Sequence, residues 1–246
     1  MKYRIGQIVP SSNVTMETEI PAIFRSRETI LPERFTFHSS RMRMKKVTKE
    51  ELEAMDAMSL KCAQELSDAH VDVMGYACLV AIMNMGRGYH CVSEVNLHQE
   101  TIANDFPTPI VTSAGALING LKVLGAKQIS IITPYMRPLT DMVVDYIEHQ
   151  GIKVKQSIAL EIPDNLEVAA QNPMNLLEIY KQLDLTDVDV LVASACVQMP
   201  SLEAIDLIQA ECGIPVTSAA VCTTYEMMKK LGIEAKSAIG DRKSVV

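Results

Sequence analysis

The sequence predicts an α/β fold made of two similar Rossmann-like parallel-sheet domains, related by a pseudo-two-fold axis, with the active site between them. Short apolar runs alternate with longer amphipathic segments, which is typical of parallel strands buried on both faces. Two runs, residues 71–80 and 188–197, open on Val-Asp-Val and carry Ala-Cys plus an aliphatic residue near their ends. Reactive groups of α/β sheets gather where parallel strands end. Cys78 and Cys196 are therefore expected to face each other as a catalytic pair.

Two other landmarks recur in the same order along the chain. The first strand of each half closes on a proline, Pro10 or Pro134. A Val-Thr-Ser-Ala block follows each cysteine, at residues 111–114 and 216–219. The separation between the copies shrinks along the chain, so the second copy has shorter connections. Three landmarks that recur in the same order indicate an internal repeat. Equivalent strand ends of the two copies are expected to meet at an interface, where pockets commonly form.

The repeat divides the chain into two expected domains. The first comprises residues 1–110 together with 218–246 and carries Cys78, and the second comprises residues 111–217 and carries Cys196. A chain of 246 residues is long enough for two small domains.

Composition excludes several classes of protein. The chain has 15 methionines, no tryptophan and four phenylalanines, so its core is expected to be aliphatic and rich in methionine. A net charge of −7 argues against binding to nucleic acid or to an anionic membrane. No window approaches the run of about 20 apolar residues that spans a bilayer. The N-terminus starts directly on a strand without a signal peptide, which predicts a cytoplasmic, reducing location.

The cysteines are not expected to form disulfides or to bind metal. In a reducing compartment the six cysteines need not pair. The chain has no Cys-x-x-Cys and no His-Glu-x-x-His motif, so it offers little support for a zinc site.

Strands and helices are expected to alternate through the first half. The expected strands are residues 3–9, 34–38, the Cys78 run and the beginning of 108–114, with helices that begin near 15, 48, 92 and 114. Pro21 is expected to limit the first helix, because a proline inside a helix removes a hydrogen bond. Thr48 with Glu51 forms a capping box, and Val47 with Leu52 forms a hydrophobic staple, so a helix is expected to run from there to about residue 68.

The second half repeats the alternation. The expected strands are residues 129–133, 152–160, the Cys196 run and the beginning of 214–219. Expected helices extend from Pro138 to Gly151, from Asn172 onward and from a Ser201 cap to Gly213. A last helix is expected to follow Ala219 and to end at Leu231-Gly232.

Two segments near the expected site have more than one interpretation. The turn at residues 10–13 offers amide donors and Asn13 to an anion at a helix N-terminus, or else Ser12 or Asn13 is an N-cap, which the residues alone favour. Residues 40–46 are basic and poorly periodic. They form either a lid that brings positive charge to an acidic substrate or a solvated connector.

Two facing thiols offer a definite chemistry. A thiolate is a strong nucleophile and a reversible leaving group. Its pKa falls at a helix N-terminus, and each cysteine is expected at a strand-to-helix junction, so partial ionisation is expected. Two opposed thiols with one ionised serve as a base and an acid, or as a nucleophile and a proton donor. The alternative, that both are small buried residues, is disfavoured by the repeat.

Several motifs together resemble maleate cis-trans isomerases of the aspartate/glutamate racemase superfamily, over nearly the whole chain. The motifs are Val9–Asn13 with Met16-Glu17, Gly75–Ala81, Thr133–Tyr135, Ile162–Asn165 and Ser194–Met199. The resemblance implies conversion of maleate to fumarate through a succinyl-cysteine adduct, with Cys78 as nucleophile and Cys196 as proton donor. It implies no metal and no organic cofactor.

The resemblance also implies how the substrate is held. It assigns the substrate carboxylates to the side chains of Asn13, Tyr135 and Asn165, and to the backbone amides of Leu79, Val80, Val197 and Gln198. It further implies a homodimer or larger homo-oligomer and a role in aromatic or nicotinate degradation.

Three alternatives remain beside the isomerase. Amino-acid racemases of the superfamily typically have threonine after at least one cysteine, whereas Leu79 and Val197 stand here. Arylmalonate decarboxylases keep only one of the two cysteines, so the presence of both disfavours that activity. A non-catalytic protein that binds a small dicarboxylate would leave the two thiols unexplained.

Overall fold

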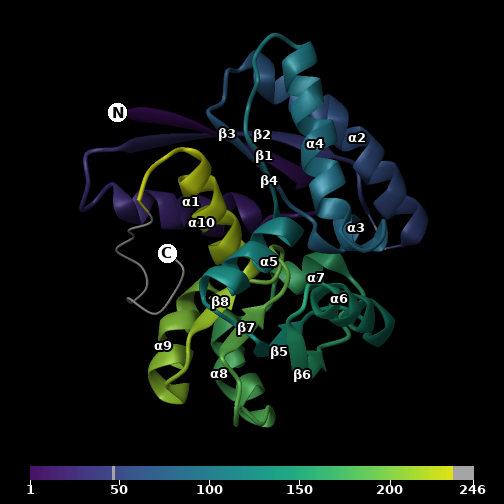
Figure 1. Cartoon of the computed structure of the whole chain (residues 1–246), viewed down its shortest axis with the longest axis vertical. Coiled ribbons are helices and arrows are strands. Elements are labelled where there is room, and N and C mark those ends of the chain that lie inside the picture. Colours follow the sequence, from purple (N-terminus) through teal and green to yellow (C-terminus); the bar gives the residue numbers. More distant parts are fainter. Residues whose placement is uncertain (46–47, 235–246) are drawn as a thin grey trace.

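The computed structural model describes residues 1–45 and 48–234, and its framework is a pair of four-stranded parallel sheets (Figure 1). The first has the order β2-β1-β3-β4 and the second β6-β5-β7-β8. The strands are β1 (Lys2–Pro10), β2 (Arg34–Met42), β3 (Val73–Tyr76), β4 (Ile110–Thr112), β5 (Gln128–Thr133), β6 (Lys153–Ala159), β7 (Val190–Ser194) and β8 (Val216–Ser218). The second order repeats the first, so the predicted α/β fold with two similar parallel sheets is confirmed.

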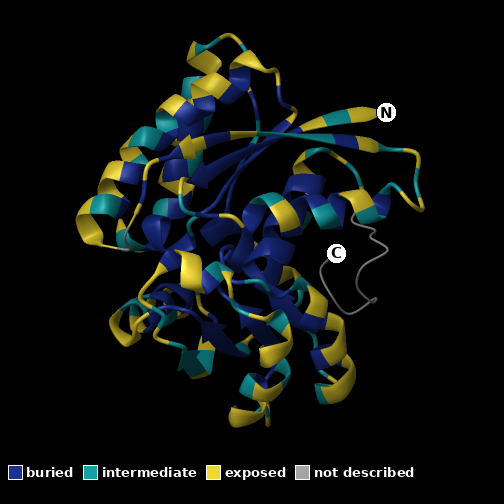
Figure 2. Cartoon of the chain, turned by 180° about the vertical axis from the view of Figure 1, so that it is seen from behind, coloured by how far each residue is buried: buried dark blue, intermediate teal, exposed yellow. Residues whose placement is uncertain are grey.

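Helices with exposed outer surfaces cover the sheets, while the inner strands β1, β3, β5 and β7 are largely buried (Figure 2). The helices are α1 (Met16–Arg27), α2 (Lys49–Asp68), α3 (Leu79–Asn84), α4 (Tyr89–Ala103), α5 (Ser113–Val123), α6 (Arg137–His149), α7 (Asn165–Ala169), α8 (Leu176–Ile179), α9 (Leu202–Cys212) and α10 (Ala219–Lys230). None of the helices in the described residues is long and apolar enough to cross a membrane.

The third strand in chain order of each sheet, β3 or β7, lies between two neighbours and is buried along its whole length. Valine and other apolar side chains on both faces explain this position, because a parallel sheet is covered by helices on both sides. The two strands that precede the cysteines are therefore among the most rigidly held parts of the fold.

The expectation that Pro21 limits the first helix is wrong. Pro21 lies inside α1, which continues to Arg27. The proline ring removes one backbone hydrogen bond, to the carbonyl of Glu17. The buried side chains of Ile20 and Phe24, packed in the core, hold the helix together across that gap.

Other departures concern short elements. The helix expected from Asn172 is broken into two 3₁₀ turns with α8 between them, and α7 was not expected. Residues 39–42 belong to β2 rather than to a connector. The Thr48 hydroxyl accepts a hydrogen bond from Glu51 N at 3.4 Å, whereas the staple residue Val47 and the end of the expected lid at residue 46 lie outside the described residues.

Helix α10 connects the two halves of the molecule. It follows β8 of the second sheet but packs against β3, β4 and α1 beside the first sheet (Figure 1). It also packs along α5, the helix that follows β4. The expected domain boundaries stay a prediction. The contacts of α10 with the first sheet favour assigning this helix to the first domain.

The α5–α10 contact depends on a glycine. A Cβ atom at Gly120 would lie 2.5 Å from the sulfur of Cys222, which is fully buried on α10. The two helix backbones approach this closely only because Gly120 has no side chain.

Replacing Gly120 therefore tests the packing between the halves. A Gly→Ala change inside an ordinary helix stabilises by about 1 kcal/mol, but the collision with Cys222 reverses the sign. We expect Gly120→Ala to lower the free energy of unfolding by about 1–3 kcal/mol, measured by chemical denaturation. Combining it with Cys222→Ala removes the colliding sulfur and restores part of the loss. A Gly120→Ala protein more stable than the parent would contradict this account.

Candidate active site

Cys78 occupies a sharp turn between β3 and α3. Its backbone has φ +88° and ψ +75°, in the left-handed region that residues other than glycine rarely adopt. Such a conformation costs about 1–3 kcal/mol and persists only where the surroundings enforce it. The turn ends the strand and places the thiol at the carboxyl edge of the sheet, with the N–H of Ala81 directed at the sulfur.

Cys196 lies at the equivalent edge of the second sheet, directly after Ala195 and the end of β7. The Ser194 hydroxyl is within hydrogen-bonding distance of the carbonyl oxygens of Cys196, at 2.9 Å, and of Met199, at 3.2 Å. The turn directs the N–H groups of Gln198 and Met199 at the Cys196 sulfur. The expectation of a direct strand-to-helix junction is wrong here, because α9 begins only at Leu202.

Both thiols line one small cavity between the two sheets. Its lining contains every residue predicted for the site, together with Pro10 and Met44, which were not predicted to bind substrate: Pro10, Asn13, Met44, Cys78, Leu79, Val80, Tyr135, Asn165, Cys196, Val197 and Gln198. The volume of the cavity is about 20 Å³, enough for about one water molecule. No cluster of three or more metal-binding side chains occurs among the described residues.

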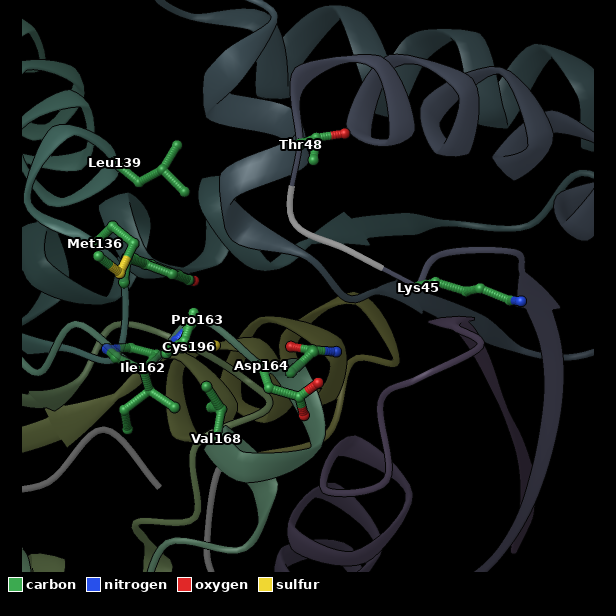
Figure 3. A pocket seen from close by; sticks show the side chains of 12 residues that line it. Lys45, Thr48, Met136, Leu139, Ile162, Pro163, Asp164, Val168 and Cys196 are labelled. Carbon is green, nitrogen blue, oxygen red and sulfur yellow. The ribbon is translucent and has the colours of Figure 1, made fainter.

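A larger cavity of about 460 Å³ adjoins the small one and shares Tyr135, Asn165 and Cys196 with it. Figure 3 shows apolar side chains around it, among them Met136 and Ile162, while the Lys45 side chain extends away from Cys196. The larger cavity is an apolar approach to the thiols.

Asn13 fills the capping role that the sequence left open, and one of its polar atoms stays available. Its side-chain oxygen accepts hydrogen bonds from Thr15 N at 3.0 Å and Met16 N at 2.9 Å, so it caps the start of α1. Its side-chain nitrogen makes no hydrogen bond to any residue in the described ranges. The nitrogen, in a side chain that is 3% exposed and lines the small cavity, is available to a ligand.

The other two predicted polar ligands already have partners. The Tyr135 hydroxyl lies 3.3 Å from the Ala195 carbonyl oxygen and within hydrogen-bonding range of the Cys196 thiol. The Asn165 side-chain nitrogen donates to the Ser12 hydroxyl at 2.8 Å. The second N–H of this amide remains for a ligand.

Both thiols are predominantly protonated near neutral pH. Burial raises the pKa of Cys78 to about 12, the Ala81 N–H opposes that rise, and Cys196 and Asp56 add to it. Burial likewise raises the pKa of Cys196. The expectation of partial ionisation is therefore wrong for the empty site, because the removal of water outweighs the nearby N–H groups.

The two thiols differ in the donors around them. The pKa of Cys196, raised by burial, is held down by the Tyr135 hydroxyl and by the N–H groups of Gln198 and Met199. Cys78 has one such donor, the N–H of Ala81. Negative charge inside the site is therefore better accommodated on Cys196.

A buried carboxylate that the sequence analysis missed ties the two halves together. Glu19, on α1, accepts hydrogen bonds from Ser201 N at 2.6 Å and Leu202 N at 2.7 Å. It caps α9, a role expected for Ser201, whose hydroxyl makes no cap hydrogen bond. Burial raises the pKa of Glu19. No local pattern reveals this cap, since Glu19 is remote from α9 in the sequence.

Two thiols at equivalent strand ends, between two parallel sheets, define a two-cysteine α/β protein of the racemase-like superfamily. Cys196 is buried and Cys78 is half-buried. The family model described as arylmalonate decarboxylase, which belongs to that superfamily, matches residues 5–242. A protein from Pseudomonas putida named maleate isomerase is 62% identical over 94% of this chain and 93% of its own length. The chain belongs to the maleate isomerase family.

Solved structures agree with this assignment. A cysteine-to-alanine variant of the maleate isomerase Iso from Pseudomonas putida S16, with maleate, has a TM-score of 0.96 at 60% identity, over 97% of this chain and 95% of that one. A cysteine-to-serine mutant of the Nocardia farcinica maleate cis-trans isomerase, with a covalently bound succinylcysteine intermediate, has a TM-score of 0.94 at 40% identity, over 99% of this chain and 98% of that one.

The protonation of Cys78 is testable without any substrate. Because its pKa is raised to about 12 and only the thiolate is alkylated, we expect reaction with iodoacetamide to be slow at pH 7. The rate is expected to increase about tenfold per pH unit through pH 9. Peptide mapping by mass spectrometry follows Cys78, with glutathione as a free-thiol control. A rate that levels off below pH 8 would show that burial does not control this thiol.

Proposed function

We propose that this protein converts maleate to fumarate through a succinyl-cysteine intermediate, with Cys78 as nucleophile and Cys196 as proton donor, and without a cofactor. The observation that carries the proposal is the meeting of two thiols from equivalent strand ends in one cavity lined by amide groups. Membership of the maleate isomerase family supports the reaction. The succinylcysteine in the Nocardia mutant supports a covalent route, since one cysteine of that protein had been replaced and another carries the adduct.

The first step joins Cys78 to the substrate. The Cys78 thiol, which is protonated in the empty site, first loses its proton to water. The resulting thiolate adds to one olefinic carbon, and the electron pair of the double bond moves to the other carbon and into its carboxylate. Cys196 donates its proton to that carbon and becomes the thiolate. A carbon–sulfur and a carbon–hydrogen bond replace the double bond, and the remaining single bond rotates freely.

The second step reverses the first on the rotated adduct. The Cys196 thiolate takes the proton back, the double bond re-forms in the trans geometry, and the carbon–sulfur bond breaks to release the Cys78 thiolate. One proton and one negative charge are thus shared by the two thiols. The Tyr135 hydroxyl and the N–H groups of Gln198 and Met199 stabilise the Cys196 thiolate of the intermediate, where fixed donors contribute most.

The carboxylates of the substrate have donors on both sides of the cavity. Leu79 and Val80 lie in the first turn of α3, where N–H groups have no partner within the helix. Asn13 offers its side-chain nitrogen, and Val197 lines the opposite side. These donors compensate for the negative charge of a dianion in a chain whose own net charge is −7.

Rotation requires more space than the small cavity offers. A four-carbon dicarboxylate is several times larger than the single water that a cavity of about 20 Å³ holds. The adjoining cavity of about 460 Å³ provides this space, since Tyr135, Asn165 and Cys196 line both. Binding is therefore expected to open the boundary formed by these side chains.

Variants of the two cysteines test the reaction. We expect Cys78→Ala and Cys196→Ala each to lower the rate of fumarate formation by at least about 10³-fold, because each removes a reacting group. Intact mass after quenching is expected to show a gain of one maleate, lost in Cys78→Ala. Cys91→Ala is the matched control, since this thiol is exposed and lies outside the small cavity. If folded, reduced parent protein forms no fumarate, the isomerase is refuted, and the racemase and the dicarboxylate-binding protein become the favoured alternatives.

We further propose that the chain forms a homodimer or larger homo-oligomer. The outer face of α4 exposes Val92, Val95 and Ile102, which are 50%, 58% and 41% exposed. The carboxylates of this helix are engaged by their own chain, Glu94 with Thr112 and Glu100 with Gln64. The neutral side chains of Asn96 and Gln99 are exposed on the same face. A partly apolar face without free charge pairs with its own copy across a two-fold axis without repulsion.

A charge in the middle of this face tests the assembly. We expect Val95→Asp to convert the protein to a monomer, because two copies of the carboxylate would meet near the two-fold axis. Size-exclusion chromatography with light scattering measures the mass. The exposed Leu207 on α9 supplies the control, and Leu207→Asp is expected to leave the mass unchanged. A parent protein that is monomeric at all concentrations would rule out the interface.

A cytoplasmic location is proposed on chemical grounds. The six cysteines are free, and a catalytic thiol pair requires a reducing compartment, since oxidation to a disulfide would remove both reacting groups. Fractionation of cells that express the protein, with immunodetection, checks the location. The role in nicotinate degradation stays a prediction.

A further inference from the structure

We propose that the side chain of Gln198 is a positioning residue that fixes the two carboxylate-binding asparagines, Asn13 and Asn165, relative to Cys196. The inference rests on the proposed function, and it concerns the side chain of a residue whose backbone amide alone was predicted to act.

Every polar atom of this side chain is used. Gln198 is 3% exposed. Its nitrogen donates to the carbonyl oxygens of Ser12, at 2.9 Å, and Asn165, at 2.7 Å. Its oxygen accepts a hydrogen bond from Val14 N at 3.0 Å. An amide has two N–H donors and a carbonyl acceptor, and each of these finds a backbone partner.

The partners belong to the substrate-binding segments. Ser12 and Val14 bracket Asn13, and the third partner is the backbone of Asn165 itself. The backbone N–H of Gln198 is directed at the Cys196 sulfur. One residue thus connects the turn after β1, the start of α7 and the turn after β7.

A second contact closes the network. The Asn165 side-chain nitrogen donates to the Ser12 hydroxyl at 2.8 Å. The nitrogen has a second N–H, which a carboxylate can accept without breaking the bond to Ser12. Gln198 and this Asn165–Ser12 bond together hold the start of α7 against the turn after β1.

The chemistry of the network requires an amide at this position. Methionine has a similar length but no hydrogen-bonding groups of comparable strength. Glutamate retains an acceptor for Val14 N but directs its other oxygen at the two carbonyl oxygens of Ser12 and Asn165, which repel it. Displacement of substrate-holding groups by about 1 Å costs about 10²-fold in rate, so loss of these bonds is expected to reach the site.

The test compares Gln198→Met and Gln198→Glu with Gln209→Met. Gln209 is also buried, at 5% exposure, and accepts a hydrogen bond from Val216 N at 3.0 Å, but it does not line either cavity at the thiols. The readouts are KM and kcat for maleate, the Kd of succinate by calorimetry, and the unfolding temperature. Succinate has no double bond, so its binding is independent of turnover.

We expect Gln198→Met to raise the KM for maleate and the Kd of succinate about 10–100-fold, with a smaller change in kcat. Gln198→Glu is expected to be at least as severe, which a role in packing alone does not predict. Gln209→Met should lower the unfolding temperature and leave KM and Kd unchanged. An unchanged KM and Kd in Gln198→Met, or near-normal binding by Gln198→Glu, would overturn the inference.

The result also separates this inference from the proposed function. Parent protein that binds succinate but makes no fumarate refutes the isomerase, while the succinate Kd of the variants still decides the role of Gln198. Parent protein that isomerises maleate, with Gln198→Met behaving like Gln209→Met, refutes only the positioning role. Folded parent protein that neither binds succinate nor makes fumarate overturns both.

Discussion

The exclusion of water from two thiols is the constraint on which the rest of the structure depends. Cys78 and Cys196 share a cavity of about 20 Å³, and burial holds both in the neutral form. In such a site, a charge is tolerated only where fixed donors meet it. The donors around Cys196 therefore define where the charge rests, and the two sheets serve to bring the edges that carry these groups together. Under the proposed mechanism, the protonation states of the two thiols therefore control the reaction more than the nucleophilicity of Cys78 does.

The interface between the halves is held by groups from distant parts of the chain. Gln198 joins the turn after β1 to the start of α7, Glu19 caps α9 from α1, and Gly120 lets α5 and α10 approach closely. Of these residues, Gln198 itself lines the small cavity at the thiols. An internal repeat produces two sheets with matching edges, but it does not by itself align them, and these side chains supply the alignment.

The fold and the pair of cysteines follow from local patterns in the sequence. The strands were located within a few residues from the apolar runs, their flanking prolines and the repeated Val-Asp-Val segments. The repeat also predicted correctly that Cys78 and Cys196 lie in one cavity. The errors have physical causes that local sequence does not carry. Core packing overrides Pro21, the cap of α9 comes from Glu19 on another element, and the ionisation of a thiol depends on how much water the assembled fold removes. Gln198 was predicted only through its backbone amide because its side-chain partners are brought together by folding.

The left-handed backbone at Cys78 has a consequence for how such a protein evolves. At φ +88° a glycine fits more easily than any residue with a Cβ atom. Selection for stability alone would thus favour exchanging Cys78 for glycine, and the chain would then keep its fold and the Cys196 thiol while losing the Cys78 thiol. Retention of cysteine at this position opposes that drift. Replacing Cys78 with glycine would thus exchange activity for stability. It would leave a folded protein whose cavity still carries the Cys196 thiol and is open to different chemistry.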